Sequence, residues 1–263
     1  MNLLYWNIRK NSIEALICDI IKEKKIDIFI VSEYEGLNFD SLLESLNKEY
    51  FLQTSYACEK VKIIYKKNID ILLLREQHRY IVSKITTKDG QYLLTAIHLP
   101  DQLHNTPDDR KYEIRKIVSD IVEEEKKLYG QKMQKSLVIG DMNASPFDSE
   151  LVNKDSFNAV LFKKVIDKTA TTKYRYDTYE RFYNPMLNYI REEDECYGSF
   201  YYSSGIGPLY WYCFDQILVR KALMNKLEKI QFLKKIKDTK LLKTVMPDKT
   251  ISDHLPLFVK IDL

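Results

Sequence analysis

The segment Ser136-Leu137-Val138-Ile139-Gly140-Asp141-Met142-Asn143 decides the fold that this sequence predicts. Its first four residues form a short, mostly apolar run, which is typical of a strand buried inside a sheet. The run leads through Gly140 directly into Asp141 and Asn143, so the strand brings a carboxylate and an amide to its carboxyl end. A rigid scaffold usually presents its chemistry on loops at strand ends. The segment therefore predicts a buried sheet with a polar site at one edge.

Other strand candidates on both sides of this segment repeat the arrangement. The runs 3–8, 26–31 and 92–98 each bring a polar side chain to their carboxyl end, and the runs 214–219 and 255–261 begin at or just after polar residues. These polar residues are Asn7, Glu33 and His98 on the N-terminal side, and Asp215, Asp253 and His254 on the C-terminal side.

Helices separate the strand candidates near the N-terminus and in the middle of the chain. Apolar residues at helical spacing predict helices at 13–21 and 39–46, with Asn11 and Glu14 as a capping box for the first. Thr106 followed by Pro107 predicts a long helix to about Leu128. Between them, short strands at 61–65, 69–74 and 80–86 follow one another closely, and Asp89-Gly90 favours a tight hairpin.

The bulk properties are those of an ordinary globular protein. The 263 residues can form a single domain, 1–263, and 45% of them are hydrophobic. A net charge of +3 is too small to mark a dedicated nucleic-acid binder. No apolar run is long enough to span a membrane, the start does not resemble a signal peptide, and the four cysteines lack the spacing of a zinc site. We therefore expect a cytoplasmic protein with reduced thiols.

The polar residues at the strand ends are mainly carboxylates and amides, with two histidines. Hard oxygen ligands of this kind suit Mg²⁺ or Mn²⁺, whereas a Zn²⁺ site would use more cysteine and histidine. A metal ion beside an imidazole base supplies the charge neutralisation and the oriented nucleophile that phosphate-ester hydrolysis needs.

At this point the sequence resembles the endonuclease/exonuclease/phosphatase superfamily, which includes DNase I, abasic-site endonucleases, sphingomyelinases, inositol-phosphate phosphatases and deadenylases. The resemblance rests on six motifs in the family's order, spread over nearly the whole chain. They are Leu4-Tyr5-Trp6-Asn7, Ser32-Glu33, Ile97-His98-Leu99, Gly140-Asp141-Met142-Asn143, Phe214-Asp215-Gln216 and Ser252-Asp253-His254. It implies an α/β fold of four layers, in which two mixed β-sheets lie between outer helices with the site at one end of the sheets.

The resemblance also implies a role for each matching residue. Glu33 is the principal metal ligand, with Asn7 and Asp253 completing or supporting the site. His254 is the general base or a phosphate-contacting group, and Asp215 orients it. The other matching residues act on the substrate: Asp141 and Asn143 bind the nucleophilic water and a phosphate oxygen, while His98 donates to a non-bridging oxygen.

Considered one at a time, several of these residues have a simpler structural interpretation. Asp141 and Asn143 can form an Asx turn, and Asp215 can pair with a lysine. The lysines between Lys226 and Lys243 can track a phosphate backbone, although an exposed surface explains them more simply. Trp211 and Tyr212, just before Asp215, are the best candidates for lining a substrate cleft.

The leading hypothesis is a divalent-metal-dependent hydrolase that cleaves phosphodiester bonds in DNA or RNA. Its partner would be a nucleic acid, and a monomer is the default assembly. A first alternative keeps the chemistry but acts on a small phosphoester or a phospholipid head group. A second alternative is a non-catalytic binding module on the same fold.

Overall fold

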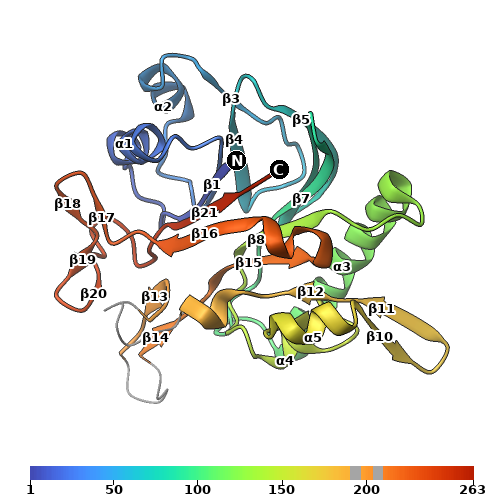
Figure 1. Ribbon diagram of the computed structural model, residues 1–263. Coiled ribbons are helices and arrows are strands. Elements are labelled where there is room, and N and C mark those ends of the chain that lie inside the picture. Colours follow the sequence, from blue (N-terminus) through green and yellow to red (C-terminus); the bar gives the residue numbers. More distant parts are fainter. Residues whose placement is uncertain (190–196, 204–209) are drawn as a thin grey trace.

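The computed structural model describes residues 1–189, 197–203 and 210–263 and contains two large β-sheets packed face to face (Figure 1). The first sheet joins both ends of the chain, because β1 pairs in parallel with β2 and antiparallel with β21. Its strands, in spatial order, are β16 (Leu227–Phe232), β21 (Leu257–Ile261), β1 (Asn2–Asn7), β2 (Ile28–Ser32), β4 (Val61–Lys66) and β3 (Tyr50–Leu52).

The second sheet is also mixed, since β8 pairs in parallel with β7 and antiparallel with β15. Its strands, in spatial order, are β5 (Asp70–Gln77), β6 (Tyr80–Thr87), β7 (Gly90–His98), β8 (Ser136–Asp141), β15 (Asp215–Arg220), β12 (Phe182–Tyr183) and β9 (Ala159–Val160). Four short ladders lie outside the sheets: β10 (Thr171–Tyr174) with β11 (Asp177–Glu180), β13 (Phe200–Tyr201) with β14 (Trp211–Tyr212), β17 (Lys235–Ile236) with β18 (Thr239–Lys240), and β19 (Leu242–Lys243) with β20 (Met246–Pro247).

Helices cover the outer faces of both sheets and complete the four layers that the resemblance implied. The first sheet carries α1 (Glu14–Lys24) and α2 (Phe39–Ser45), and the second carries the long α3 (Pro107–Tyr129) (Figure 1). The shorter elements are α4 (Ser149–Val152), α5 (Lys163–Lys168) and the 3₁₀ turns Met186–Tyr189 and Lys221–Lys226. The predicted fold class, an α/β sandwich of two mixed sheets, is confirmed.

The alternation of side chains along β8 shows why its sequence is a continuous apolar run. Leu137 and Ile139 face the core between the two sheets, whereas Val138 faces the core under α3, where it packs with Ile114 and Ile117. Both faces of the strand are buried, so no polar residue alternates with the apolar ones. Gly140 is required because a Cβ there would lie 1.9 Å from the Ile97 carbonyl oxygen, at a φ of +157°.

The two predicted helix caps had different outcomes. Thr106 forms the capping box of α3, exchanging hydrogen bonds with Asp109, and Pro107 occupies the first turn. The capping box predicted for α1 is wrong, because the Asn11 side chain donates to the Ile251 carbonyl instead. Glu14 accepts from the backbone of the segment before α2, so it joins two helices rather than capping one.

The structure also bears on the expectations for membrane spans, cysteines and strands. Among the described residues no helix is long and apolar enough to cross a membrane. Cys18 and Cys58 are buried and form no disulfide within the described residues, and Cys196 lies outside them. Strand β16 was not predicted, because its exposed glutamate and lysine hide the apolar alternation of Ile230 and Phe232.

Candidate active site

The pairing register of both sheets brings the motif residues to one end of the sandwich. In the first sheet Asn7, the last residue of β1, pairs with Ser32 and so lies next to Glu33. In the second sheet Asp141 pairs with His98 on one side and with Asp215 on the other. Residues far apart in the sequence are therefore neighbours because their strands end at the same level.

These residues surround a cavity of about 530 Å³. Asp215 does not line it but lies fully buried beneath it. The predicted site residues that line the cavity are Asn7, Glu33, His98, Asp141, Asn143, Asp253, His254 and Tyr212.

An amide and two carboxylates meet on one side of the cavity. The Nδ2 group of Asn7 donates to Glu33 Oε1 at 3.0 Å and to Asp141 Oδ2 at 3.2 Å, so one amide joins the two sheets. Asp253 lies apart from this group, because its Oδ2 pairs with Arg9 Nε at 3.4 Å. The structure therefore brings Asn7, Glu33 and Asp141 together directly, with Asp253 at the cavity wall.

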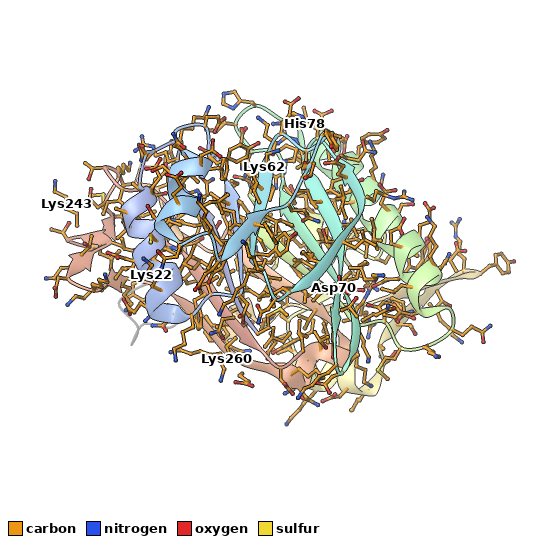
Figure 2. All side chains as sticks on the ribbon, turned by 90° about the horizontal axis from the view of Figure 1, so that it is seen from above. Lys22, Lys62, Asp70, His78, Lys243 and Lys260 are labelled. Atoms are coloured by element: carbon orange, nitrogen blue, oxygen red, sulfur yellow. The ribbon has the colours of Figure 1, made fainter. Side chains whose placement is uncertain are left out.

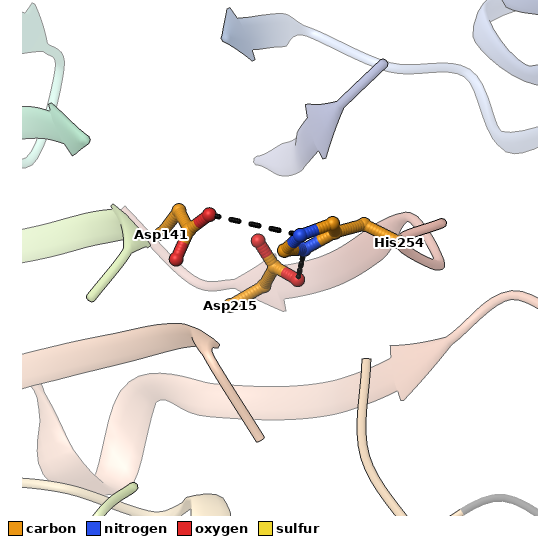
Figure 3. A group of neighbouring side chains, drawn as sticks. All are labelled: Asp141, Asp215 and His254. Carbon is orange, nitrogen blue, oxygen red and sulfur yellow. Dashed lines mark hydrogen bonds and ion pairs between the residues drawn. The ribbon is translucent and has the colours of Figure 1, made fainter. Parts of the chain in front are cut away.

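His254, which lines the cavity, forms a buried pair with Asp215 (Figure 3). Asp215 Oδ2 lies 2.8 Å from His254 Nδ1, and His254 Nε2 lies 3.9 Å from Asp141 Oδ2. Burial alone would lower the pKa of His254, but Asp215 and then Asp141 and Asp253 raise it to about 10. Burial raises the pKa of Asp215 above its ordinary value. With a pKa of about 10, His254 keeps its proton at neutral pH, so we place the one proton of the pair on the imidazole.

His98 has the opposite electrostatic character. Its Nε2 lies 3.7 Å from Asp141 Oδ2 and 4.0 Å from Glu33 Oε1, beyond hydrogen-bond range. Burial lowers its pKa, and the two carboxylates only partly oppose this effect. His98 is therefore a neutral imidazole that is free to turn a ring N–H toward a ligand.

Asp141 and Asn143 form an Asx turn, and the Asp141 side chain contacts other site residues at the same time. Asp141 Oδ1 accepts from the Asn143 backbone N–H at 2.8 Å, while Oδ2 faces Asn7 and the two histidines. Asn143 has a φ of 46° and Glu33 a φ of 48°. Both residues thus sit where the chain turns through the left-handed region immediately after a strand, a conformation uncommon outside glycine.

Buried hydrogen bonds fix the backbone of the site. Trp6 Nε1 donates to the His254 carbonyl at 2.9 Å, and Ser252 Oγ donates to the Asn7 carbonyl at 2.7 Å. Arg110, a buried residue of α3, donates at 2.8 Å to the Asn143 carbonyl. The fixed loops hold the reactive side chains in place before any ligand binds, which favours catalysis.

An aromatic wall forms the side of the cavity nearest His254. The Phe200 ring centroid lies 4.8 Å from the His254 ring and 5.4 Å from Phe214, which lies 5.1 Å from Tyr212. The prediction for Trp211 needs correction. Neighbouring strand residues face opposite ways, so while Tyr212 lines the cavity, Trp211 is buried against Tyr201.

Sequence reasoning missed several residues that line the cavity. Phe200 and Tyr202 belong to the aromatic wall. The charged residues missed in the lining are three cations and three carboxylates: Lys10, Lys60, Arg79, Glu35, Glu59 and Asp101. No motif marks these residues in the sequence. Leu99 and Phe214, which lie inside quoted motifs, carried a signal that could have identified them as lining residues.

The donor set fits a hard divalent cation. Glu33 and Asp141 offer carboxylate oxygens on one side of the cavity. The Asn7 amide lies between them, with Nδ2 donating to both carboxylates and Oδ1 accepting from the Arg9 backbone N–H at 3.1 Å. One ligand atom each from Asp141, Asp215 and His254 also lie within 4.8 Å of one another. In that second group Asp215 and His254 already bind each other, so the oxygen-rich side around Glu33 is the better place for a metal.

Similarity to known proteins is confined to the fold. No protein-family model matches the chain, and no curated protein matches its sequence. Among solved structures, the endonuclease domain of TRAS1, a telomere-specific non-LTR retrotransposon, has a TM-score of 0.60 at 13% identity and covers 100% of this chain and 98% of its own. D. rerio TDP2 complexed with single-strand DNA product gives 0.58 at 15%, covering 100% and 99%. An endonuclease/exonuclease/phosphatase family protein from Leptotrichia buccalis gives 0.58 at 15%, covering 100% of both chains.

Proposed function

We propose that this chain, which has the fold of the endonuclease/exonuclease/phosphatase proteins, is a divalent-metal-dependent hydrolase that cleaves phosphodiester bonds in DNA or RNA. The observation that carries the proposal is the convergence of Glu33, Asp141 and the His254–Asp215 pair on one cavity. The structural neighbours add support, since they include an endonuclease domain and a protein crystallised with a DNA product.

We place the cation against Glu33, with the Asp141 carboxylate beside it. Asn7 would support the site by hydrogen bonds to both carboxylates, and Asp253 by its charge at the cavity wall, where it also pairs with Arg9. Magnesium or manganese suits these oxygen donors. When bound, such an ion offsets the carboxylate charge and polarises a phosphate oxygen.

The protein's own residues then handle the proton and the phosphate. Asp215 holds His254 through Nδ1, which leaves Nε2 on the cavity side to take a proton from the attacking water. For this step the pKa of His254 must fall below its value of about 10, and neutralisation of Asp141 and Asp253 acts in that direction. Asp141 and Asn143 orient the water and one phosphate oxygen.

His98 would also contact the phosphate. As a neutral imidazole it donates to a non-bridging oxygen while negative charge builds there. The aromatic wall supports a nucleic-acid substrate, because rings stack on bases of any identity.

A substrate panel with and without EDTA tests the proposal. Single-stranded DNA, duplex DNA and RNA are incubated with the protein and Mg²⁺, beside nucleotides, sugar phosphates and a phospholipid head group. We expect cleavage of at least one nucleic acid, abolished by EDTA and restored by excess Mg²⁺. Release of phosphate from small esters alone would move the substrate class to the first alternative, and no turnover of any substrate would favour a binding module.

A further inference from the structure

The segment 233–249, here called the lysine arm, forms two small hairpins, β17–β18 and β19–β20, that extend from the sandwich beside α1 and β13 (Figure 1). It holds six lysines and two aspartates, a net charge of +4. The whole chain carries only +3, so all other residues together sum to −1. The net positive charge of the chain therefore comes from this one projecting element, because the charges of the other residues nearly cancel.

The arm is held firmly on the sandwich by its apolar residues. Ile236 and Leu241 are buried, and Leu233 donates a backbone hydrogen bond to the Pro256 carbonyl. Lys237 secures the first hairpin to α1, with its Nζ 2.6 Å from Asp19 Oδ1 and its backbone N–H donating to Glu23. The arm thus presents its remaining charges on a fixed surface.

Three lysines of the arm remain available to an external anion. Within the described parts of the chain, Lys240, Lys243 and Lys249 are exposed and form no ion pair. Figure 2 shows Lys243 at the margin of the molecule. Asp248 accepts hydrogen bonds from Thr250, and the charge of Lys243 also helps to lower the pKa of Asp248, although the two side chains form no ion pair. Exposed lysines that are not held in ion pairs can bind a phosphate backbone.

The arm adjoins the cavity through two contacts. Lys249 is joined to it by Arg9, whose Nη1 donates to the Lys249 carbonyl at 3.0 Å and whose Nε pairs with Asp253 on the cavity wall. The second contact is between β20 and β13, and β13 contributes Phe200 to the aromatic wall. A strand that leaves the cavity past this wall therefore meets the arm.

We propose that the lysine arm is a phosphate-binding surface that holds the sugar-phosphate backbone of a nucleic acid beyond the cleaved bond, an inference that rests on the proposed function. A nucleic acid fits better than an anionic membrane, because membrane-surface elements bury an apolar face. The arm has no such face, since Ile236 and Leu241 point inward and Val245 is the exposed large apolar residue of the segment.

The test is the salt dependence of binding to a labelled single strand of about 20 nucleotides, measured with EDTA present so that no cleavage occurs. Replacing Lys240, Lys243 and Lys249 together by alanine is expected to make the slope of log K against log salt about 2 units shallower, since each phosphate contact contributes about 0.7. Because this electrostatic contribution vanishes near 1 M salt, the same slope predicts binding weaker by on the order of 100-fold at 0.1 M salt.

Two control variants separate this effect from a general change in charge or folding. Arginine at the same three positions is expected to keep the slope. Alanine at Lys163, Lys164 and Lys168, exposed lysines of α5 that do not line the cavity, is expected to keep it as well.

Turnover distinguishes failure of the arm from failure of the proposed function. In the alanine variant we expect the ratio of kcat/KM for the long strand to that for a dinucleotide to fall. Three results would refute the proposed role of the lysine arm. They are an unchanged salt slope in the alanine variant, no binding of the strand by the wild-type protein, and an alanine variant that loses binding to phosphatidylserine vesicles but still binds the strand. If the wild-type protein cleaved neither substrate while the salt slope changed as expected, the proposed hydrolase function would be refuted. The lysine arm would then remain a nucleic-acid-binding surface.

Discussion

Replacing Asp215 by asparagine removes one negative charge from the buried pair and little else. The side chain is fully buried, and the new amide has the same size as the carboxylate. Its oxygen can still accept from His254 Nδ1, so the ring orientation is kept while the charge is lost. The variant therefore isolates the electrostatic part of the interaction.

The structure sets the size of the expected effect. The pKa of His254 is about 10 against an ordinary 6.5, and Asp215 is the first of the groups that raise it. We expect the pKa to fall toward or below 6.5 in the variant, because burial then acts with less opposition. Turnover should fall by about 10²- to 10⁴-fold, which corresponds to about 3 to 5 kcal/mol of barrier, because the imidazolium that forms when His254 takes the proton of the water loses the negative charge that stabilises it.

The pair also makes stability depend on pH in a definite direction. The pKa of His254 is higher in the folded protein than in the unfolded chain, so its protonation stabilises the folded state. This contribution to the free energy of unfolding is fully present below pH 6.5 and is lost as pH rises toward about 10. In that window the free energy of unfolding of the wild-type protein should fall by on the order of 1 kcal/mol per pH unit. The asparagine variant should lack this slope.

The assay is an NMR titration of the histidine ring signals in EDTA-treated protein, with urea unfolding at several pH values and turnover measured in parallel. Circular dichroism confirms that the variant is folded. A His254 pKa that stays near 10 in the variant, or turnover equal to that of the wild type, would refute the assigned electrostatic role of Asp215.

Three further substitutions test other parts of the structure. Glu33→Gln should raise the Mg²⁺ concentration for half-maximal activity at least about 10-fold with little change in stability, and an unchanged metal dependence would exclude Glu33 as the principal ligand. Gly140→Ala should leave little folded protein, because its Cβ would overlap the Ile97 carbonyl oxygen; a soluble variant with wild-type melting temperature would contradict that packing. Thr106→Ala should cost about 1 kcal/mol in urea unfolding through loss of the α3 cap, and a stability equal to wild type would show that the cap contributes nothing.

The sequence predicted a feature of the site correctly where a single strand determines the position of the residue. Asp141 ends a strand that is buried on both faces, so the apolar run before it was continuous and the end of the strand was clear. Asn7 and His98 end their strands in the same way, and the register of two sheets then brings them together. The order of the strands could not be predicted, because pairing between distant segments leaves no local pattern.

The errors have specific physical causes. Trp211 and Tyr212 are adjacent on a strand, and the sequence does not say which of two neighbours faces the cavity. Phe200 reaches the cavity because β13 meets His254 through an isolated bridge, a contact across more than fifty residues of chain. The α1 cap failed because Asn11 found a tertiary partner in Ile251, which no local rule foresees.

Cleavage of a labelled oligonucleotide by the wild-type and His254→Ala proteins at saturating Mg²⁺ tests the central claim most directly. We expect wild-type cleavage that stops when EDTA is added, and a rate lower by about 10²- to 10⁴-fold in a folded variant. Equal rates for the two proteins, or cleavage that continues in EDTA, would contradict a metal-dependent reaction at this cavity.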